Sequence, residues 1–282
     1  MFEECYIEDQ VLINFLCAFL LIITASNVLA EHKKTLHIGV SFSIPPWVIQ
    51  EQNSGIELDI LRTVLEKEHY IVQPHYIPFA LAYQRFDAHQ LDGVINAKAG
   101  VAKHGYLTNP VVTFQNVAIS LNQKKLPLDI SITDLVNKQV VAFQKASTLL
   151  GSEFSSMAEK NTDYLEVANQ ILQLNLLFIR EVDFIVMDKS IFGYFWHKSQ
   201  RSNPNDLNAE HLKLFKQPIR FHPMFAPSPY PFIFADKDVR DVFNRGLKEL
   251  KESGQYAEIF KRYNHLTNLY DTSADAGQIP TQ

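Results

Sequence analysis

Short apolar runs of strand type alternate with segments of helical spacing along this chain of 282 residues, and this alternation restricts the fold more than any other feature. In the first series the strand-type runs cover 35–40, 71–77 and 91–96, and the helical segments cover 55–68 and 81–89. Strands separated by helices pair in parallel, because the helix returns the chain to the same edge of the sheet. The pattern therefore predicts an α/β unit with largely parallel strands.

A second series follows a long strand that we expect at residues 111–121. It begins with a short helix (132–136), a strand (139–143) and a helix that starts at about Thr148. Another helix (166–177), a buried strand (183–187), an extended proline-rich stretch (218–231) and an amphipathic helix broken at Gly254 (238–263) follow. The polar residues 199–208 are expected to form a surface loop. Two such units fit this chain length, since each is large enough to bury a core.

The composition excludes several classes of protein and of site. The chain is 46% hydrophobic and 20% charged, with a formal net charge of -5. A nucleic-acid-binding domain usually carries a basic patch, so no nucleic-acid partner is expected. The histidines show no HxH or HExxH spacing, and no GxSxG or phosphate-loop motif is present. The sequence therefore predicts no metal site, no cofactor and no catalytic group.

The N-terminal segment predicts export. Residues 11–25 are nearly all apolar and are followed by SNVLA, which is typical of a secretory signal peptide cleaved after Ala30. Because the preceding ten residues are acidic rather than basic, an uncleaved N-terminal anchor stays open as an alternative. Both cysteines, Cys5 and Cys17, precede the predicted cleavage site. We therefore expect a signal peptide over 1–30 and a cysteine-free mature protein in the periplasm.

Seven sequence pieces, in order, carry a family resemblance: LHIGV with PPW after it, GIELD, LDGVINA, LTNP, ITDLVNKQVVAFQKAST, REVDFIVMD and LKELKESGQYAEIFKRY. Over about 36–263 the chain resembles the type II periplasmic solute-binding proteins, specifically the family 3 amino-acid-binding group. This resemblance implies a two-lobed α/β fold with a ligand cleft between the lobes and two crossovers. Lobe one would cover 31–119 plus 231–268, lobe two would cover 120–230, and 269–282 would be a disordered tail.

Two second-lobe positions are candidate ligand contacts. The loop from Gln144 to Thr148 leads from a strand into a helix, whose free backbone N–H groups favour an anion, and Ser147 and Thr148 add hydroxyls. The alternative for Ser147 is an ordinary helix N-cap. The resemblance implies that Asp188 accepts the ammonium group of a ligand, and the alternative is that it caps the following helix.

In the first lobe, the aromatic candidates Trp47, Phe79 and Tyr83 could stack on a ligand, with ordinary packing as the alternative. Glu57 and Asn96 are the polar candidates.

The stretch from Asn96 to Asn109 departs from the family pattern. The resemblance implies an arginine that clamps the ligand carboxylate, and this stretch contains none. Lys98 or Lys103 could hold an anion only as a point charge.

These observations predict a monomeric binding protein that captures a small polar solute, an amino acid or a related anion or zwitterion, for an ABC-type membrane permease. Two alternatives remain open. One is a sensing module that signals to a membrane partner. The other is a cyclohexadienyl-dehydratase-like enzyme on the same fold, in which Glu57 or Asp188 would act as the acid.

Overall fold

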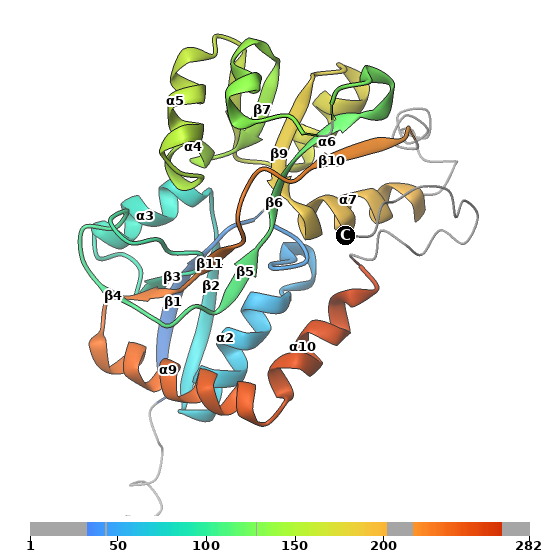
Figure 1. Ribbon diagram of the computed structural model, residues 1–282. Coiled ribbons are helices and arrows are strands. Elements are labelled where there is room, and N and C mark those ends of the chain that lie inside the picture. Colours follow the sequence, from blue (N-terminus) through green and yellow to red (C-terminus); the bar gives the residue numbers. More distant parts are fainter. Residues whose placement is uncertain (1–32, 43, 128, 202–216, 267–282) are drawn as a thin grey trace, which may run out of the picture.

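The computed structural model describes residues 33–42, 44–127, 129–201 and 217–266, and it shows two α/β lobes, each built on its own five-stranded sheet (Figure 1). The alternation of strands and helices in the sequence therefore predicted the fold class correctly. The expectations for 1–30, for most of 199–208 and for 269–282 concern residues outside these ranges.

The sheet of the first lobe has the strand order β2-β1-β3-β12-β4. Its strands are β1 (Lys34–Val40), β2 (Tyr70–Tyr76), β3 (Gly93–Val94), β4 (Tyr106–Leu107) and β12 (Ile233–Phe234). Strand β1 pairs in parallel with β2 and β3, whereas β12 pairs antiparallel with β3 and β4. The strand β12 thus returns from the far end of the sequence to complete the lobe.

The helices of the first lobe are α2 (Ile56–Lys67), α3 (Phe79–Asp87), α9 (Lys237–Glu252) and α10 (Gln255–Asn264), with a short 3-10 helix η1 at Gln50–Gln52. Helix α2 packs against β2, α9 and α10, while α3 packs against β1 and β3. The predicted break at Gly254 is confirmed, because this residue has φ +79° and separates α9 from α10. No helix in the described ranges is long and apolar enough to cross a membrane.

The sheet of the second lobe has the strand order β10-β6-β9-β7-β8. Its strands are β6 (Asn116–Leu121), β7 (Val140–Phe143), β8 (Tyr164–Val167), β9 (Phe184–Asp188) and β10 (Ile219–His222). The helices of this lobe are the 3-10 helices η2 (Asn122–Lys124) and η3 (Ile132–Asn137), then α4 (Ala146–Leu149), α5 (Ser152–Lys160), α6 (Ile171–Ile179) and α7 (Lys189–Arg201). Strand β9 is buried along its whole length, as its apolar sequence predicts.

Three predicted elements differ from the structure in their bounds, and residues 199–201, expected in a surface loop, instead end helix α7. The predicted start of the helix expected at 166–177 was wrong. Glu166 and Val167 belong to β8, and α6 begins at Ile171. Pairing with β7 decides this segment, since a tertiary contact overrides local helical spacing. The helix expected from about Thr148 is the short α4, which begins at Ala146, followed by a separate α5.

The single strand expected at 111–121 is two strands, β5 (Val112–Phe114) and β6. They part at Gln115, whose backbone N–H donates to Asp188 at 2.8 Å instead of joining a ladder. Strand β5 pairs antiparallel with β11 (Ser228–Tyr230), and this ribbon lies where the chain passes between the lobes (Figure 1).

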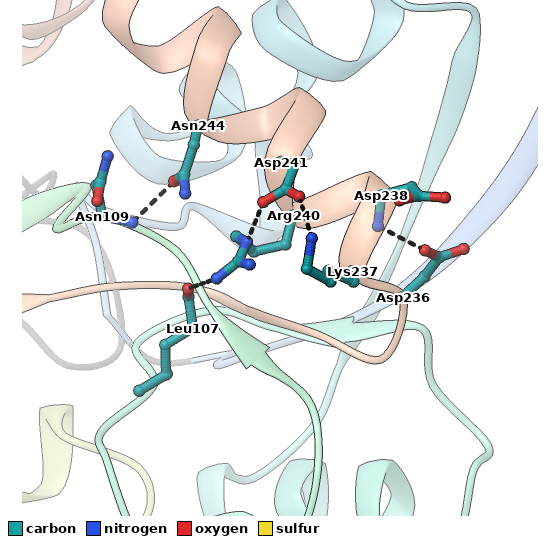
Figure 2. A network of polar contacts seen from close by, with 8 residues as sticks. All are labelled: Leu107, Asn109, Asp236, Lys237, Asp238, Arg240, Asp241 and Asn244. Atoms are coloured by element: carbon teal, nitrogen blue, oxygen red, sulfur yellow. Dashed lines mark hydrogen bonds and ion pairs between the residues drawn. The ribbon is translucent and has the colours of Figure 1, made fainter.

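A polar network ties helix α9 to β4 and to the residues that follow it (Figure 2). Asp236 caps α9 by accepting from the backbone N–H of Asp238 at 2.8 Å. Arg240 donates to the carbonyl oxygen of Leu107 at 3.1 Å, which fixes α9 against β4. Further along the helix, Asn244 accepts from the backbone N–H of Asn109 at 2.8 Å. These contacts hold the sequence-distant α9 as an integral part of the first lobe.

Candidate ligand-binding cleft

A cleft with an empty volume of about 530 Å³, its opening to solvent included, lies between the two lobes. Residues from both lobes and from the connecting ribbon line it: Ser41, Ile44, Phe79, Asn96, Phe114, Asn116, Phe143, Gln144, Leu149, Ala168, Gln170, Asp188 and Tyr230. Its walls are mostly apolar and carry a few polar groups, which is the usual composition of a small-molecule site. The predicted residues Phe79, Asn96, Gln144 and Asp188 therefore face one cavity.

The first turn of α2 is held against the Pro46–Trp47 loop. The backbone N–H groups of Ile56 and Glu57 donate to the carbonyl oxygens of Pro46 and Trp47, at 3.0 and 2.9 Å. Gly55 permits this approach: it has φ +130°, and a Cβ there would lie 2.5 Å from the carbonyl oxygen of Trp47. The sequence GIELD therefore positions the carboxyl group of Glu57 beneath the cleft.

Asp188 is buried at the end of β9, where it is held by four hydrogen bonds. Its Oδ1 accepts from Nε1 of Trp47 at 3.0 Å and from the backbone N–H groups of Ser190 and Ile191 at 2.9 and 3.2 Å. Its Oδ2 accepts from the backbone N–H of Gln115 at 2.8 Å. Asp188 thus caps α7, the alternative considered from the sequence, and also lines the cleft. Burial raises the pKa of Asp188, and these donors oppose the rise.

Glu57 is fully buried and contacts the cleft through Asn96. Its Oε2 accepts a hydrogen bond of 3.0 Å from Nδ2 of Asn96. Burial raises the pKa of Glu57 to about 8, the hydrogen bond from Asn96 lowers it in part, and the charge of Asp188 adds to the rise. Asn96 has φ +55°, a conformation that asparagine tolerates better than most residues. Two carboxyl groups therefore lie within electrostatic range of each other at the base of the cleft.

Three buried polar atoms at this base have no hydrogen-bond partner in the part of the chain that the structure describes. They are Oε1 of Glu57, Oδ1 of Asn96 and Nδ2 of Asn116. A buried polar group without a partner costs free energy, so such groups mark places where a ligand completes the network. Oδ1 of Asn96 is an acceptor, and Oε1 of Glu57 is one when its carboxyl group is ionised, which suits a ligand that donates hydrogen bonds.

Further polar contacts join the lobes across the cleft. The backbone N–H of Ala80 donates to Oε1 of Gln144 at 3.2 Å, and Nζ of Lys98 donates to the carbonyl oxygen of Leu149. Burial lowers the pKa of Lys98. The lysine that the sequence suggested as an anion contact is therefore engaged with a backbone carbonyl of the opposite lobe.

The loop before α4 is occupied by a carboxylate of the protein itself. Glu166 accepts hydrogen bonds from the backbone N–H of Lys145 at 2.7 Å, and from the backbone N–H and hydroxyl of Ser147 at 2.8 and 2.7 Å. The hydroxyl of Tyr164 also donates to Glu166, at 2.8 Å. Ser147 thus faces Glu166, and the side chain of Thr148 is exposed. The backbone N–H and the hydroxyl of Ser147, which we expected to meet a ligand anion, meet Glu166 instead.

The remaining candidates divide between the cleft region and the surface. The ring of Trp47 packs against that of Phe114 in a tilted arrangement, with a centroid distance of 4.8 Å and an interplanar angle of 31°. The buried Tyr83 packs edge-to-face against Phe79, with centroids 4.9 Å apart, and its hydroxyl donates to the carbonyl oxygen of Asn96 at 3.4 Å. Lys103 is exposed and does not line the cleft. Trp47 and Tyr83 therefore support the lining residues from behind.

Sequence reasoning missed Asn116, Phe114 and Tyr230 as cleft residues. Asn116 is buried in β6, and a signal for it was present, because Gln115 and Asn116 interrupt an otherwise apolar run. Tyr230 lies in a proline-rich stretch whose conformation gave no indication of where its ring would lie. Burial raises the pKa of Tyr230 to about 12, and the charges of Asp188 and Glu57 add to the rise. Among the residues that the structure describes, no group of His, Cys, Asp and Glu could hold a metal ion.

The match with a known family decides what this architecture is. Residues 36–265 match the model of the bacterial extracellular solute-binding proteins, family 3. The chain belongs to this family. The resemblance inferred from seven short sequence pieces is thereby confirmed, and the matched region of this solute-binding protein includes all residues that the pieces span. The comparison with curated proteins finds no match.

Solved structures with the same fold include binding proteins and sensor domains. The GluR0 ligand-binding core in complex with L-glutamate has 20% sequence identity and a TM-score of 0.65, covering 83% of this chain and 99% of that one. A histidine kinase sensor domain similar to periplasmic binding proteins has 16% identity and a TM-score of 0.66, covering 83% and 97%. The arginine-, lysine-, histidine-binding protein ArtJ of Geobacillus stearothermophilus has 14% identity and a TM-score of 0.63, covering 83% and 99%. At these identities the likeness establishes the two-lobed fold of this solute-binding protein. The class of its ligand has to be inferred from the residues of the cleft.

Proposed function

We propose that this protein is a periplasmic binding protein that captures a small polar solute with a protonated nitrogen and presents it to an ABC-type membrane permease. The observation that carries this proposal is the pair of buried carboxyl groups at the base of the cleft, Glu57 and Asp188. In the described part of the chain, no arginine or lysine is among the lining residues, and Lys98, which reaches across the cleft, is bound to the carbonyl oxygen of Leu149. A cationic group on the ligand would supply the missing positive charge.

The contacts between the lobes support a binding role by closure. Trp47 and Asp188 join the lobes through a buried hydrogen bond, while Lys98 and Leu149 join them through a partly buried one. Few hydrogen bonds of this kind cross between the lobes in the described chain, so the lobes can separate about the connecting ribbon and close again over a solute. A solute bound between the lobes favours the closed state by the free energy of its contacts with both of them.

The same features argue against a carboxylate as the main recognition group. The stretch from Asn96 to Asn109 lacks arginine, and the donors of the α4 loop already bind Glu166. A ligand carboxylate near Asp188 would also meet like charge. Of the solutes considered from the sequence, the ones that carry a cationic nitrogen fit the cleft best.

A sensing role is the second candidate, and the likeness to a histidine kinase sensor domain favours it. A sensor would stay attached to the membrane or to its signalling partner, whereas a carrier for a permease would be released after export. N-terminal sequencing of the exported protein distinguishes the two. A start at Glu31 supports the carrier, and a start at Met1 supports the attached sensor.

We propose no catalytic step for this cleft. A lyase of the dehydratase type would use Glu57 as a buried proton donor, but Glu57 is not among the residues that line the cleft, and its Oε2 is engaged by Asn96. A general acid needs direct hydrogen-bond reach of its substrate, or reach through one water molecule. Product formation from a prephenate-like substrate, lost on Glu57→Ala, would overturn this part of the proposal.

A thermal-shift screen tests the proposed function. The panel contains agmatine, L-arginine, L-glutamine, putrescine and glutarate, each tested with the wild-type protein and with Asp188→Asn. A solute present at 100 times its Kd stabilises the fold by about 2.7 kcal/mol, which corresponds to a Tm rise of roughly 5–10 °C for a protein of this size. We expect a rise with at least one nitrogen cation and a smaller rise in Asp188→Asn. The absence of any shift across the panel would contradict the proposed function.

A further inference from the structure

The contact between Glu57 and Asn96 has a consequence for ligand selection that goes beyond the presence of a cation. An ionised carboxylate can only accept hydrogen bonds, so it must face Nδ2 of the Asn96 amide, as it does at 3.0 Å. The two ends of a planar amide point apart. With Nδ2 directed at Glu57, Oδ1 of Asn96 is the end left for the cleft, and it has no partner in the described ranges.

A protonated Glu57 removes this constraint. A carboxylic acid both donates and accepts, so the Asn96 amide can turn by half a rotation about its terminal torsion and direct Oδ1 at Glu57 and Nδ2 at the cleft. The polarity that Asn96 offers to a ligand is thus tied to one proton on Glu57.

The surroundings of Glu57 bring the pKa of its carboxyl group close to neutral pH. The charged and titratable groups that face it from other elements are Asp188 of β9, Tyr230 of β11 and Tyr256 of α10. Each of these groups is neutral or negative, and Oε1 of Glu57 has no partner in the described chain. Burial raises the pKa of Glu57 to about 8, so protonated and ionised forms coexist near neutral pH in the empty cleft. A cation in the cleft would lower this pKa again by direct attraction.

We propose that Glu57 is a positioning residue that sets the ligand class: when ionised, it holds Asn96 with its carbonyl oxygen towards the cleft, beside Asp188, so that the site takes an ammonium, amidinium or guanidinium group. This inference rests on the proposed function, because it assigns the polarity of the same cleft. Capture of the cation releases the proton: Glu57–COOH and the free cation become the Glu57 carboxylate with the bound cation, plus one H⁺. The affinity for the cation therefore increases as the pH rises towards 8, and it becomes independent of pH above this value.

Calorimetric titration with agmatine tests the inference, because both of its charged groups stay protonated from pH 6.5 to 8.5. With a pKa of about 8 for the empty site, the ionised fraction of Glu57 grows about 25-fold over this range, and we expect the affinity to grow in proportion. In Glu57→Gln, which also presents both a donor and an acceptor to Asn96, the affinity should be independent of pH. Glu66→Gln, on the exposed side of the same helix, should keep the wild-type pH dependence.

A second readout does not depend on the variant. Titrations of the wild type in two buffers of different ionisation enthalpy at pH 7 should show the release of nearly one proton on binding. An affinity of the wild type that does not change with pH, or a slope that persists in Glu57→Gln, would overturn the inference.

The outcomes also separate this inference from the proposed function. Tight binding of glutamine, which carries an ammonium group, without proton release would leave the proposed function standing and refute the role of Glu57. No heat with any solute at either pH would refute both.

Discussion

Nε1 of Trp47 donates a hydrogen bond of 3.0 Å to Oδ1 of Asp188, and this bond joins a loop of the first lobe to the end of β9 in the second. Asp188 in turn caps α7 and fixes Gln115, where the connecting ribbon becomes β6. One carboxyl group thus links both lobes, the ribbon between them and the cleft. Because both side chains are buried, the bond is shielded from competing water.

Trp47→Phe should weaken the link between the lobes. The variant keeps an aromatic ring against Phe114 but removes the donor to Asp188, and a hydrogen bond to a charged group contributes about 1.5–3 kcal/mol. We expect a loss of this size in the free energy of unfolding by urea. Trp196→Phe, whose ring stacks on Phe192 in α7, is the matched control, and an equal loss in the control would contradict the assignment.

Glu57 should make stability depend on pH. Its pKa is raised from 4.5 to about 8 on folding, so the folded protein binds the extra proton between these values. The corresponding stability is fully present below the unfolded pKa and is lost as the pH rises through the folded pKa. Asp188, whose pKa is also raised, contributes with the same sign. The free energy of unfolding should therefore fall between pH 5 and 8.

The Glu57→Gln variant isolates this contribution. One proton changes stability by at most about 1.4 kcal/mol per pH unit, so removing the titrating group should flatten the profile by up to that slope. Urea unfolding at intervals from pH 5 to 8 measures both profiles. If the two curves run parallel, Glu57 does not bind an extra proton in the folded protein.

Lys98 should hold the cleft closed in the absence of a solute. Its ammonium group donates to the carbonyl oxygen of Leu149 across the cleft, and Lys98→Met keeps most of the side-chain length without the donor. Loss of about 1.4 kcal/mol from the closed state would shift the balance of open and closed forms tenfold. We expect a larger radius of gyration in small-angle X-ray scattering for Lys98→Met. The exposed Lys103→Met should match the wild type, and identical radii for all three proteins would refute the role of Lys98.

Gly55 should be required for the placement of α2. An alanine there would adopt an unfavourable φ of +130° and bring its Cβ within 2.5 Å of the carbonyl oxygen of Trp47. Gly151 is a useful control, since it has φ +99° and a Cβ added there would meet nothing within 4 Å. Gly151→Ala should cost about 1–2 kcal/mol of strain alone, and Gly55→Ala clearly more. Equal thermal stabilities of the two variants would show that the approach to Trp47 is not constrained.

The chain order of strands and helices was sufficient to predict the α/β lobes, because strand β1 and helix α2 carry clear apolar periodicities. It did not predict the strand at Glu166, since β8 is a short edge strand whose pairing with β7 decides its conformation. Because of that error the contact of Ser147 was not foreseen. Glu166, which we expected in a helix, lies in β8 and supplies the carboxylate that accepts from Ser147 in the loop before α4.

The cleft was predicted best where a side chain directly follows a strand. Asp188 ends β9 and Asn96 follows β3, so the sheet topology carries both to the cleft. Tyr230 comes from the ribbon between the lobes and Asn116 begins β6, and the direction of both side chains depends on how distant segments pair. The unpaired oxygen atoms of Glu57 and Asn96 are likewise a property of packing, which depends on contacts between segments far apart in the sequence.

The central claim is that the cleft selects its solute by positive charge, and a ranking of affinities tests it most directly. Calorimetric titration at pH 8.5 compares agmatine, glutamine and glutarate, which are of similar size and carry positive, zwitterionic and negative charge. We predict the affinity order agmatine, glutamine, glutarate in the wild type, with a much smaller spread in Asp188→Asn. Tightest binding of glutarate, or an unchanged ranking and spread in Asp188→Asn, would contradict the claim.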